Sequence, residues 1–580
     1  MKNLFFAKVK FLIMSVMLIQ CLYGNSQSLK FQWAQRIIDY GLAVHPAMEV
    51  DSKGNMYIAG GFSGTRDFDP GAGIFTLTSN GNTDMFISKF DRYGQFLWAR
   101  QMGGASIDVV QAIEIDTLDD IYISGRFEGT VDFDPGTGTY PLTSLNANAS
   151  VISKFNGSGN MLWAKKFDVY TMIPITLDLT GNVYAAGYFN GKVDFDPDAG
   201  VFDLTDTHNG DVFYLKLNTS GKFVWALKVS NPEYHYMFNS QGINSDRSIA
   251  VDASGNIYAT GWFSKTVDFD PGAGVYSLTT FGTDKNITRP DIFISKLDAS
   301  GNFVWAKQIG GLGVENPNDI LIDASGNIVI TGTHPGETDF DPGVSTNNLP
   351  GGGTFIAKYD SSGDLIWVNQ LNGIGWENDM RRIRTDKLNN VYCSGSFSGT
   401  VDFDPGTGIY NMTSNGMSDM YISKMDSSGQ FGWAKHLGGT SDDKGRWFSL
   451  DETGNIYLMG GFSGNLDINP DTGVCNLSST DSSDIFIMKL GDPSLEIEEF
   501  PAGEDGIYIY PNPNGGNFVV RSAVDGYYSI QNEIGQIIQT FAIHQDSTHE
   551  IQIEGLAPGI YFIIGSGKRH AIRQKIIVLK

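Results

Sequence analysis

The sequence predicts an all-β protein that consists mainly of a β-propeller, and three observations support this prediction. A tryptophan phrase, usually Trp-Ala, recurs seven times at intervals of roughly 60 to 80 residues, and such a period indicates a repeat architecture. The 70 Gly, 37 Phe and 24 Tyr residues are typical of many short strands joined by tight turns. Patterns typical of helices are almost absent. The anchors are Trp33, Trp98, Trp163, Trp225, Trp305, Trp367 and Trp433.

One copy of the repeat shows four short strands. Residues 291–298 alternate like a strand, 302–309 form a second, 320–323 a third and 328–332 a fourth. The turns after the first and third strands place Gly301 and Gly326 where a left-handed residue is needed. Four antiparallel strands per unit are typical of a propeller blade.

The count of each element predicts how the ring closes. The first-strand phrase, the Trp phrase and the fourth strand each occur seven times, but the chain starts at a second strand near Trp33 and stops at a first strand near Asp484. Unpaired strand edges are prone to aggregation. We therefore predict one closed seven-bladed propeller over residues 29–490, in which residues 484–490 complete a composite blade begun by residues 29–61.

The repeat phrase resembles a known family. It reads Asp-x-Phe-x-x-Lys-Leu-Asp-x-x-Gly-Asn, then Trp, Gly-Gly and Asp-x-x-Gly-Asn-x-Tyr-x-x-Gly. This is similar to the bacterial seven-bladed beta-propeller repeat often called SBBP, over residues 29–490. The copies depart from the phrase at Ala149, Thr354 and Asp119-Asp120. The resemblance implies an exported or surface-exposed protein, in a family whose members mostly have no assigned activity.

Strand parity divides the connections between two faces. The turns between strands 1 and 2 and between strands 3 and 4 lie on one face, and the longer, variable connections lie on the other. We call these the turn face and the connection face, and we expect ligands on the connection face. The candidate ligand-binding residues are aromatic or polar residues that break the repeat in its loops, with ordinary loop packing as the alternative. They are Tyr234, His235, Tyr236, Trp376 and Trp447.

The long connection between strands 4 and 1 repeats the motif Asp-Phe-Asp-Pro-Gly. Two carboxylates two residues apart, followed by a turn, could present oxygens to a calcium ion, although the later bidentate Glu of an EF-hand is missing. The alternative is a Pro-Gly turn in which the Asp side chains cap backbone amides. The candidate ligands are Asp67, Asp69, Asp132, Asp134, Asp194, Asp196, Asp268, Asp270, Asp339, Asp341, Asp402 and Asp404, and the seventh copy reads Asp467-Ile-Asn-Pro.

Signals for catalysis are poor. The chain has no Gly-x-Ser-x-Gly elbow, no His-Glu-x-x-His motif and no phosphate-binding loop. The propeller histidines occupy different repeat positions, so they predict neither a shared metal site nor a triad; they are His45, His208, His235, His334 and His436. The Trp anchors have a fixed place in the second strand, which favours packing between adjacent sheets over stacking on sugars. We therefore expect a non-enzymatic protein, with no catalytic residues.

The N-terminus predicts export. Lys2, Lys8 and Lys10 are followed by an apolar stretch over 11–22 and by small and polar residues over 24–28. This pattern predicts that residues 1–27 are a signal peptide. Lipidation of Cys21 is the disfavoured alternative, because a small residue is expected just before the cysteine. The later chain has no unbroken apolar run of about 18 residues and predicts no membrane span. The net charge of −25 argues against a nucleic-acid partner. Cys393 and Cys475 do not suggest a disulfide.

The C-terminal part of the sequence differs from the repeats in composition and pattern. Residues 491–505 read as an exposed linker, and residues 506–580 as a small all-β, Ig-like sandwich. Its phrases, in order, are Ile507-Tyr-Ile-Tyr-Pro-Asn-Pro513, Tyr528-Ser-Ile-Gln-Asn-Glu-Ile-Gly535, Gly555-Leu-Ala-Pro-Gly-Ile-Tyr-Phe562 and Gln574-Lys-Ile-Ile-Val-Leu-Lys580. They resemble the type A C-terminal sorting domain of type IX secretion. The resemblance implies that the type IX secretion machinery recognises residues 506–580, and that the protein is secreted or lies on the outer-membrane surface of a Gram-negative bacterium.

Together these observations predict a secreted or cell-surface adhesion or binding protein, whose connection face binds a glycan or a protein. The one candidate cofactor is calcium. The alternative from a different class is an extracellular propeller enzyme, such as a lyase, a glycosidase or a quinoprotein, with its site in the central channel or on the connection face.

Overall fold

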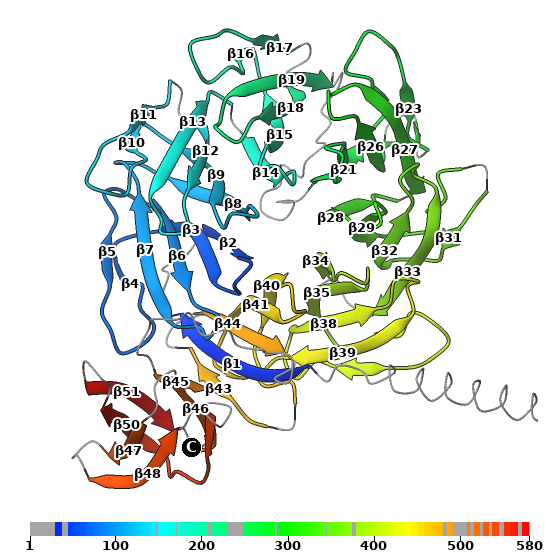
Figure 1. Ribbon diagram of the computed structural model, residues 1–580. Coiled ribbons are helices and arrows are strands. Elements are labelled where there is room, and N and C mark those ends of the chain that lie inside the picture. Colours follow the sequence, from blue (N-terminus) through cyan, green and yellow to red (C-terminus); the bar gives the residue numbers. More distant parts are fainter. Residues whose placement is uncertain are drawn as a thin grey trace, which may run out of the picture.

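The protein is built from β-strands. The computed structural model describes residues 29–578 except for residues 38–43, 146–148, 170, 207–209, 230–247, 282, 285–286, 312, 344, 374–378, 472, 480–483, 492–506, 511–515, 523–525, 533–535, 544–549 and 567–570. The signal peptide, and the linker apart from Gly491, therefore lie outside the described residues. Figure 1 shows a ring of sheets around a central axis and a separate group of strands at the C-terminal end.

Four-stranded antiparallel sheets, which we call blades, form the ring, and the strands of each blade are named from the innermost to the outermost. Blade 1 contains β2 (Val44–Val50), β3 (Met56–Phe62), β6 (Asp84–Phe90) and β7 (Phe96–Met102). Blade 2 contains β8 (Val109–Ile115), β9 (Ile121–Phe127), β12 (Ala149–Phe155) and β13 (Met161–Phe167). Blade 3 contains β14 (Thr171–Leu177), β15 (Val183–Phe189), β18 (Asp211–Leu217) and β19 (Phe223–Val229).

The remaining blades follow the same order. Blade 4 contains β20 (Ile249–Val251), β21 (Ile257–Phe263), β26 (Asp291–Leu297) and β27 (Phe303–Gly311). Blade 5 contains β28 (Asn316–Ile322), β29 (Ile328–His334), β32 (Gly353–Tyr359) and β33 (Leu365–Gly373). Blade 6 contains β34 (Asp379–Thr385), β35 (Val391–Phe397), β38 (Asp419–Met425) and β39 (Phe431–Leu437). Blade 7 contains β40 (Lys444–Leu450), β41 (Ile456–Phe462), β44 (Asp484–Gly491) and β1 (Lys30–Ile37).

A short hairpin is inserted between the second and third strands of each blade. These hairpins hold the Asp-Phe-Asp-Pro motifs, and those of blades 5 and 6 extend the sheet of the preceding blade. The pairs are β4 (Thr65–Asp67) with β5 (Thr76–Thr78), β10 (Thr130–Asp132) with β11 (Pro141–Thr143), β16 (Lys192–Asp194) with β17 (Asp203–Thr205), β22 (Thr266–Asp268) with β23 (Ser277–Thr279), β30 (Thr338–Asp339) with β31 (Asn348–Leu349), β36 (Thr400–Asp402) with β37 (Asn411–Thr413), and β42 (Asn465–Asp467) with β43 (Asn476–Ser478). Blade 4 adds β24 (Thr283–Asp284) and β25 (Ile287–Thr288).

The two ends of the ring pair with each other, as predicted. Strand β1 runs antiparallel to β44, with Ala34 opposite Met488 and Arg36 opposite Phe486. The predicted composition of the composite blade is wrong, however. Strands β2 and β3 belong to blade 1, so the N-terminus contributes only β1, and the C-terminal part contributes β40, β41 and β44. Each blade thus begins at the strand that we expected to be third in the unit, and the predicted copy over 291–332 is divided between blades 4 and 5.

Burial explains the strand patterns. Every residue of β3 is buried, because neighbouring blades cover both faces of a second strand. In the outermost strand β7, only Ala99 and Met102 are buried, and the other residues are partly or fully exposed. Each Trp anchor packs against the next blade: Trp33 donates an indole N–H to the carbonyl of Arg92, and a methyl group on Gly94 would lie 2.8 Å from its ring. The anchors therefore join adjacent sheets, as predicted.

The Asp-x-x-Gly-Asn-x-Tyr motif forms the turn between the first two strands. Asp51 accepts N–H bonds from Lys53 and Asn55 and the phenol O–H of Tyr57. Lys89, from the first-strand phrase, lies 4.6 Å from the centre of the Tyr57 ring and 3.6 Å from Asp51. Asp51, Tyr57 and Lys89, all from one blade, thus interact with one another through a hydrogen bond, an ion pair and a cation–π contact. These interactions stabilise the turn face.

The C-terminal strands form two further sheets. Strands β45 (Ile507–Tyr510), β46 (Phe518–Ser522) and β49 (Glu550–Ile553) make one sheet, and β48 (Ile537–Ile543), β47 (Gly526–Asn532), β50 (Gly559–Ser566) and β51 (Ala571–Val578) make the other. Side chains from both sheets share one hydrophobic cluster, which contains no propeller residue. Within the described part of the chain, no helix is long and apolar enough to cross a membrane.

Candidate functional site

The Asp-Phe-Asp-Pro hairpins lie on the connection face, and their Asp side chains bind backbone amides. Asp67 accepts N–H bonds from Asp69 and Phe75 through a single oxygen, and Asp69 accepts the N–H of Gly71. The same bonds recur in four other pairs: Asp132 and Asp134, Asp268 and Asp270, Asp339 and Asp341, and Asp402 and Asp404. The pair Asp194 and Asp196 differs only in that Asp196 accepts the N–H of Asp198, which stands in place of the glycine. This is the capping arrangement expected of a turn.

Calcium binding by these pairs stays a prediction. Asp67 accepts both of its amide N–H bonds through Oδ1, and capping alone accounts for this geometry. Among the described residues, no group of three or more His, Cys, Asp or Glu side chains is placed to hold a metal ion.

The hairpins also connect adjacent blades at the Gly-Gly repeat. Gly103 forms an antiparallel bridge with Asp132 of the next blade's hairpin. A methyl group on Gly104 would lie only 2.4 Å from the carbonyl oxygen of Thr130 in that hairpin. Glycine is therefore required at this position because the backbones of two blades approach each other closely.

The predicted ligand-binding aromatic residues are not brought together by the described structure. Tyr234, His235, Tyr236 and Trp376 lie outside the described residues. Trp447 was expected in a loop, and that expectation is wrong: it lies in the innermost strand β40 and is 5% exposed. The guanidinium of Arg382 lies 3.6 Å from the centre of the Trp447 ring. Trp447 thus packs against a neighbouring inner strand, since innermost strands meet closely around the central axis.

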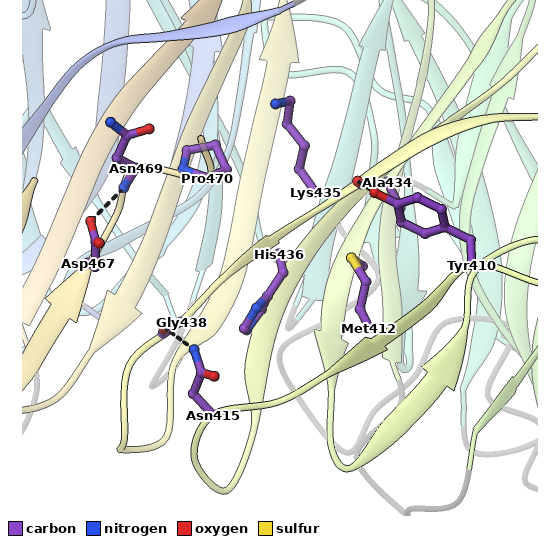
Figure 2. Close-up of a pocket in the computed structure, with 10 residues that line it drawn as sticks. All are labelled: Tyr410, Met412, Asn415, Ala434, Lys435, His436, Gly438, Asp467, Asn469 and Pro470. Carbon is purple, nitrogen blue, oxygen red and sulfur yellow. Dashed lines mark hydrogen bonds between the residues drawn. The ribbon is translucent and has the colours of Figure 1, made fainter. Parts of the chain in front are cut away.

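A pocket of about 380 Å³ lies between the hairpins of blades 6 and 7. Figure 2 shows Tyr410 and Met412 of the blade 6 connection on one side, and Asn469 and Pro470 of the blade 7 connection on the other. Other lining residues are Asn415, Ala434, Lys435, His436, Gly438 and Asp467. The pocket is thus formed by two successive connections and by the outermost strand β39.

Hydrogen bonds fix several of the lining groups. The Tyr410 O–H donates to the carbonyl of Ala434, and the Asn415 amide donates to the carbonyl of Gly438. His436 Nε2 lies 2.6 Å from the Oδ2 atom of Asp419, whose side chain is completely buried, whereas the His436 side chain is 23% exposed. Since Asp419 orients the imidazole, the pocket combines an aromatic ring with fixed polar groups.

Aliphatic side chains mark the tips of the hairpins. One β-branched aliphatic residue follows the last glycine of the motif in most blades, and it is strongly exposed. Isolated exposed apolar residues are common, but recurrence at one repeat position gives the rim of the connection face a regular apolar character. These residues are Ile74, Val201, Val275, Ile409 and Val474, with exposed fractions of 68–84%.

Sequence reasoning missed the pocket and its His436–Asp419 pair. A signal was present, because His436 stands where blades 1 and 4 have Gln101 and Gln308. Tyr410 and Asn415 gave no signal, since related residues occur in other copies. Cys393 and Cys475 are free thiols, as expected.

Comparison with protein families identifies the end of the chain. The model of the secretion system C-terminal sorting domain matches residues 508–579. Together with the sheets described above, this match makes the chain a propeller protein exported by type IX secretion, which is released or held at the cell surface.

Among curated proteins, the chain is similar to an uncharacterized WD repeat-containing protein, L264, of Acanthamoeba polyphaga mimivirus. The two are 25% identical over 511 residues, which is 76% of this chain and 36% of that protein. The chain thus spans about a third of the length of this curated relative.

Solved structures with a similar arrangement share little sequence with this chain. The Dos1 propeller is 9% identical, with a TM-score of 0.35, over 80% of this chain and 95% of that one. A polysaccharide lyase of family PL25, an ulvan lyase bound to a GlcA–Rha3S unit, is 12% identical, with a TM-score of 0.37, over 80% and 94%.

Proposed function

We propose that this protein is a non-enzymatic binding or adhesion protein, displayed or released by type IX secretion, whose connection face binds a glycan or a protein. In this proposal, residues 29–490 form a seven-bladed propeller of the SBBP type. The composite blade, in which β1 pairs with β44, closes the propeller. Residues 506–580 form an Ig-like sandwich that the secretion machinery recognises, after the linker 491–505.

The pocket between the blade 6 and blade 7 hairpins is the observation that carries this proposal. Binding sites are commonly concave and place a few polar groups beside an aromatic or apolar wall. In this pocket the wall is Tyr410 with Met412, and the polar groups are Asn415, Lys435 and His436. Such a surface suits the hydroxyl groups and apolar faces of a sugar ring.

Two further features support binding on the same face. Tyr234, His235 and Tyr236 lie in a segment that the sequence predicts to belong to this face, outside the described residues, and they stay predicted contacts together with Trp376. The exposed aliphatic tips, such as Ile74 and Ile409, offer apolar contacts to a protein partner. The turn face, by contrast, consists of short turns with one repeated hydrogen-bond pattern.

An extracellular enzyme is the second candidate, and one observation favours it. His436 is oriented by the buried Asp419, and a partly exposed imidazole held by a carboxylate is a common arrangement for a general base. No Ser, Thr or Cys lies among the described lining residues of the pocket to serve as a nucleophile, so this candidate comes second.

A glycan and extracellular-matrix array tests the proposal, with the mature protein as probe. We expect Tyr410→Ala and Asn415→Ala to reduce binding at least tenfold. The matched control is Tyr140→Ala, because Tyr140 occupies the same repeat position and donates the same hydrogen bond, to Ala164, but does not line the pocket.

Binding that is unchanged in both pocket variants would remove the pocket from the proposal. The array ligands also distinguish the second candidate: an enzyme would convert a bound glycan, and His436→Gln would abolish the conversion while retaining binding. Stable, unmodified ligand after prolonged incubation supports the binding protein.

A further inference from the structure

A buried aspartate begins the third strand of most blades, and its surroundings differ from blade to blade. Asp84, Asp211, Asp291 and Asp419 are completely buried, and Asp484 is 2% exposed. Charge in such a site is costly unless a partner compensates it. The way in which each blade compensates this carboxylate can therefore be compared within one molecule.

In two blades a lysine or arginine side chain of the outermost strand approaches the carboxylate. Arg36 Nη1 lies 3.2 Å from Asp484 in blade 7, and Lys228 Nζ lies 3.4 Å from Asp211 in blade 3. Both basic residues stand opposite the residue two positions after the aspartate, so the sheet register makes them equivalent. These blades show that a positive charge fits at this place.

In blades 1 and 4 the same register position holds a neutral glutamine. Gln101 Nε2 donates to Asp84 Oδ2 at 2.7 Å, and Gln308 Nε2 donates to Asp291 Oδ2 at 2.5 Å. An amide satisfies one oxygen but supplies no charge. Oδ1 of both aspartates has no hydrogen-bond partner among the described residues.

The following connection adds a second buried acid beside each of these aspartates. Glu315 follows blade 4 and is completely buried; its Oε1 accepts the O–H of Thr338, whereas its Oε2 has no hydrogen-bond partner in the described part of the chain. Burial and the charge of Asp291 raise the pKa of Glu315. Asp108 follows blade 1, and burial, together with the charge of Asp84 and Glu128, raises its pKa to about 6.

Glycines shape the space around the pair in blade 4. A methyl group on Gly310 would lie 2.5 Å from the unpartnered Oδ1 of Asp291, and one on Gly313 would lie 2.9 Å from Glu315 Oε1. Both carboxylates therefore border the same glycine-rich connection, and each presents an unpartnered oxygen in a buried place. Unsatisfied buried acceptors of this kind are rare in folded proteins and call for a partner.

We infer that Asp291 and Glu315 bind one divalent cation of the calcium type at the junction of blades 4 and 5. The pair Asp84 and Asp108 differs, because both carboxylate oxygens of Asp108 accept backbone N–H bonds, from Gly104 and Glu128. The cation supplies the positive charge that Arg36 and Lys228 supply in their own blades, but it does so at Oδ1 of Asp291, because Gln308 already donates to Oδ2. Calcium prefers carboxylate oxygens and completes its coordination with carbonyl oxygens and water. This role is structural and separate from ligand binding at the connection-face pocket.

Calcium titration of the chelator-treated mature protein tests the inference. We expect calcium to be retained after desalting and to raise the melting temperature at pH 7.5 by about 2–4 °C, because only the folded state binds it. At pH 5 the rise should be smaller, since protons compete for the carboxylates. The described groups that face this pair, Gln308 and Thr338, are neutral and do not titrate in this range.

Variants assign one bound ion to the proposed site. Asp291→Asn with Glu315→Gln should lower the number of calcium ions per chain by one. The matched control is Asp339→Asn with Asp341→Asn, which alters the hairpin pair of blade 5 while leaving an oxygen to cap the same amides. Gln308→Lys supplies the ammonium found in blade 3, and it should raise the melting temperature without calcium and also remove one ion.

The inference is overturned if the folded protein binds no calcium at 10 mM, a concentration far above the typical affinity range of extracellular calcium modules, roughly 0.1–1 mM. It is also overturned if the ion is lost in the Asp339 and Asp341 control but kept in Gln308→Lys. Because Gln308→Lys keeps both acids, it remains decisive if the double acid variant does not fold.

Discussion

The absence of a side chain at Gly104 allows the backbones of two adjacent blades to approach each other closely. A Cβ atom there would lie 2.4 Å from a backbone oxygen of the next hairpin, and backbone cannot move aside as a flexible side chain can. We expect Gly104→Ala to cost about 1–3 kcal/mol of folding free energy. The control is Gly336→Ala, where no atom lies within 4 Å of the added carbon. Equal denaturation midpoints for the two variants would contradict this explanation of the Gly-Gly repeat.

The burial of Asp291 predicts how the stability of the folded protein changes with pH. Burial raises the pKa of Asp291 from 3.8 to about 6. A carboxyl with a higher pKa in the folded than in the unfolded state favours folding when protonated, so its contribution falls as the pH rises from about 4 to above 6. In metal-free buffer, the melting temperature should therefore fall between pH 5 and pH 7.5, and it should fall less in Asp291→Asn. Identical pH profiles for the two proteins would refute this prediction.

Residue roles were only partly predictable from the sequence. The repeat phrase indicated that Trp33 and its equivalents pack between sheets, because a fixed strand position implies a fixed neighbour. The pairing of His436 with Asp419 was missed although the sequence held a signal for it, and the proximity of Asp291 to Glu315 gave no signal. These partners lie on different strands or connections, and sheet register and blade curvature bring them together.

At the scale of the element, the repeat predicted strands well but misplaced the blade boundaries. A cyclic repeat of four strands reads the same wherever the unit is divided, so the sequence alone does not show which connection crosses between sheets. The structure places that crossing after the Trp strand, which leaves β1 as the outermost strand of blade 7. The pairing of the two ends was predictable, because counting the phrases left one unmatched strand at each end.

Engineered cysteines test the pairing of β1 with β44. Ala34 and Met488 are opposite each other and belong to the same hydrophobic cluster, whereas Ile487 points to the other face of the strand. We expect Ala34→Cys with Met488→Cys to form a disulfide under mild oxidation and to raise the melting temperature, since a disulfide needs neighbouring Cβ atoms. Ala34→Cys with Ile487→Cys should stay reduced. Efficient cross-linking of the second pair instead would show a different register.

At the scale of the whole molecule, the C-terminal sheets and the propeller have separate hydrophobic clusters. We therefore expect a chain that ends at residue 491 to keep the melting temperature of the propeller within about 2 °C, because no shared core is lost. In the native host the same truncation should stop export past the outer membrane, as fractionation and immunoblotting would show. A truncated chain that reaches the medium normally would contradict the role of residues 508–579 in sorting.

The central claim is that a ligand binds the connection face while the turn face stays free. Hydrogen–deuterium exchange of the mature protein, with and without its tightest array ligand, tests this claim most directly. We predict slower exchange in the connections that contain Tyr410 to Asn415 and Asp467 to Pro470, and unchanged exchange in turns such as Asp298 to Asn302. Protection confined to the turn face or to the C-terminal sheets would contradict the claim.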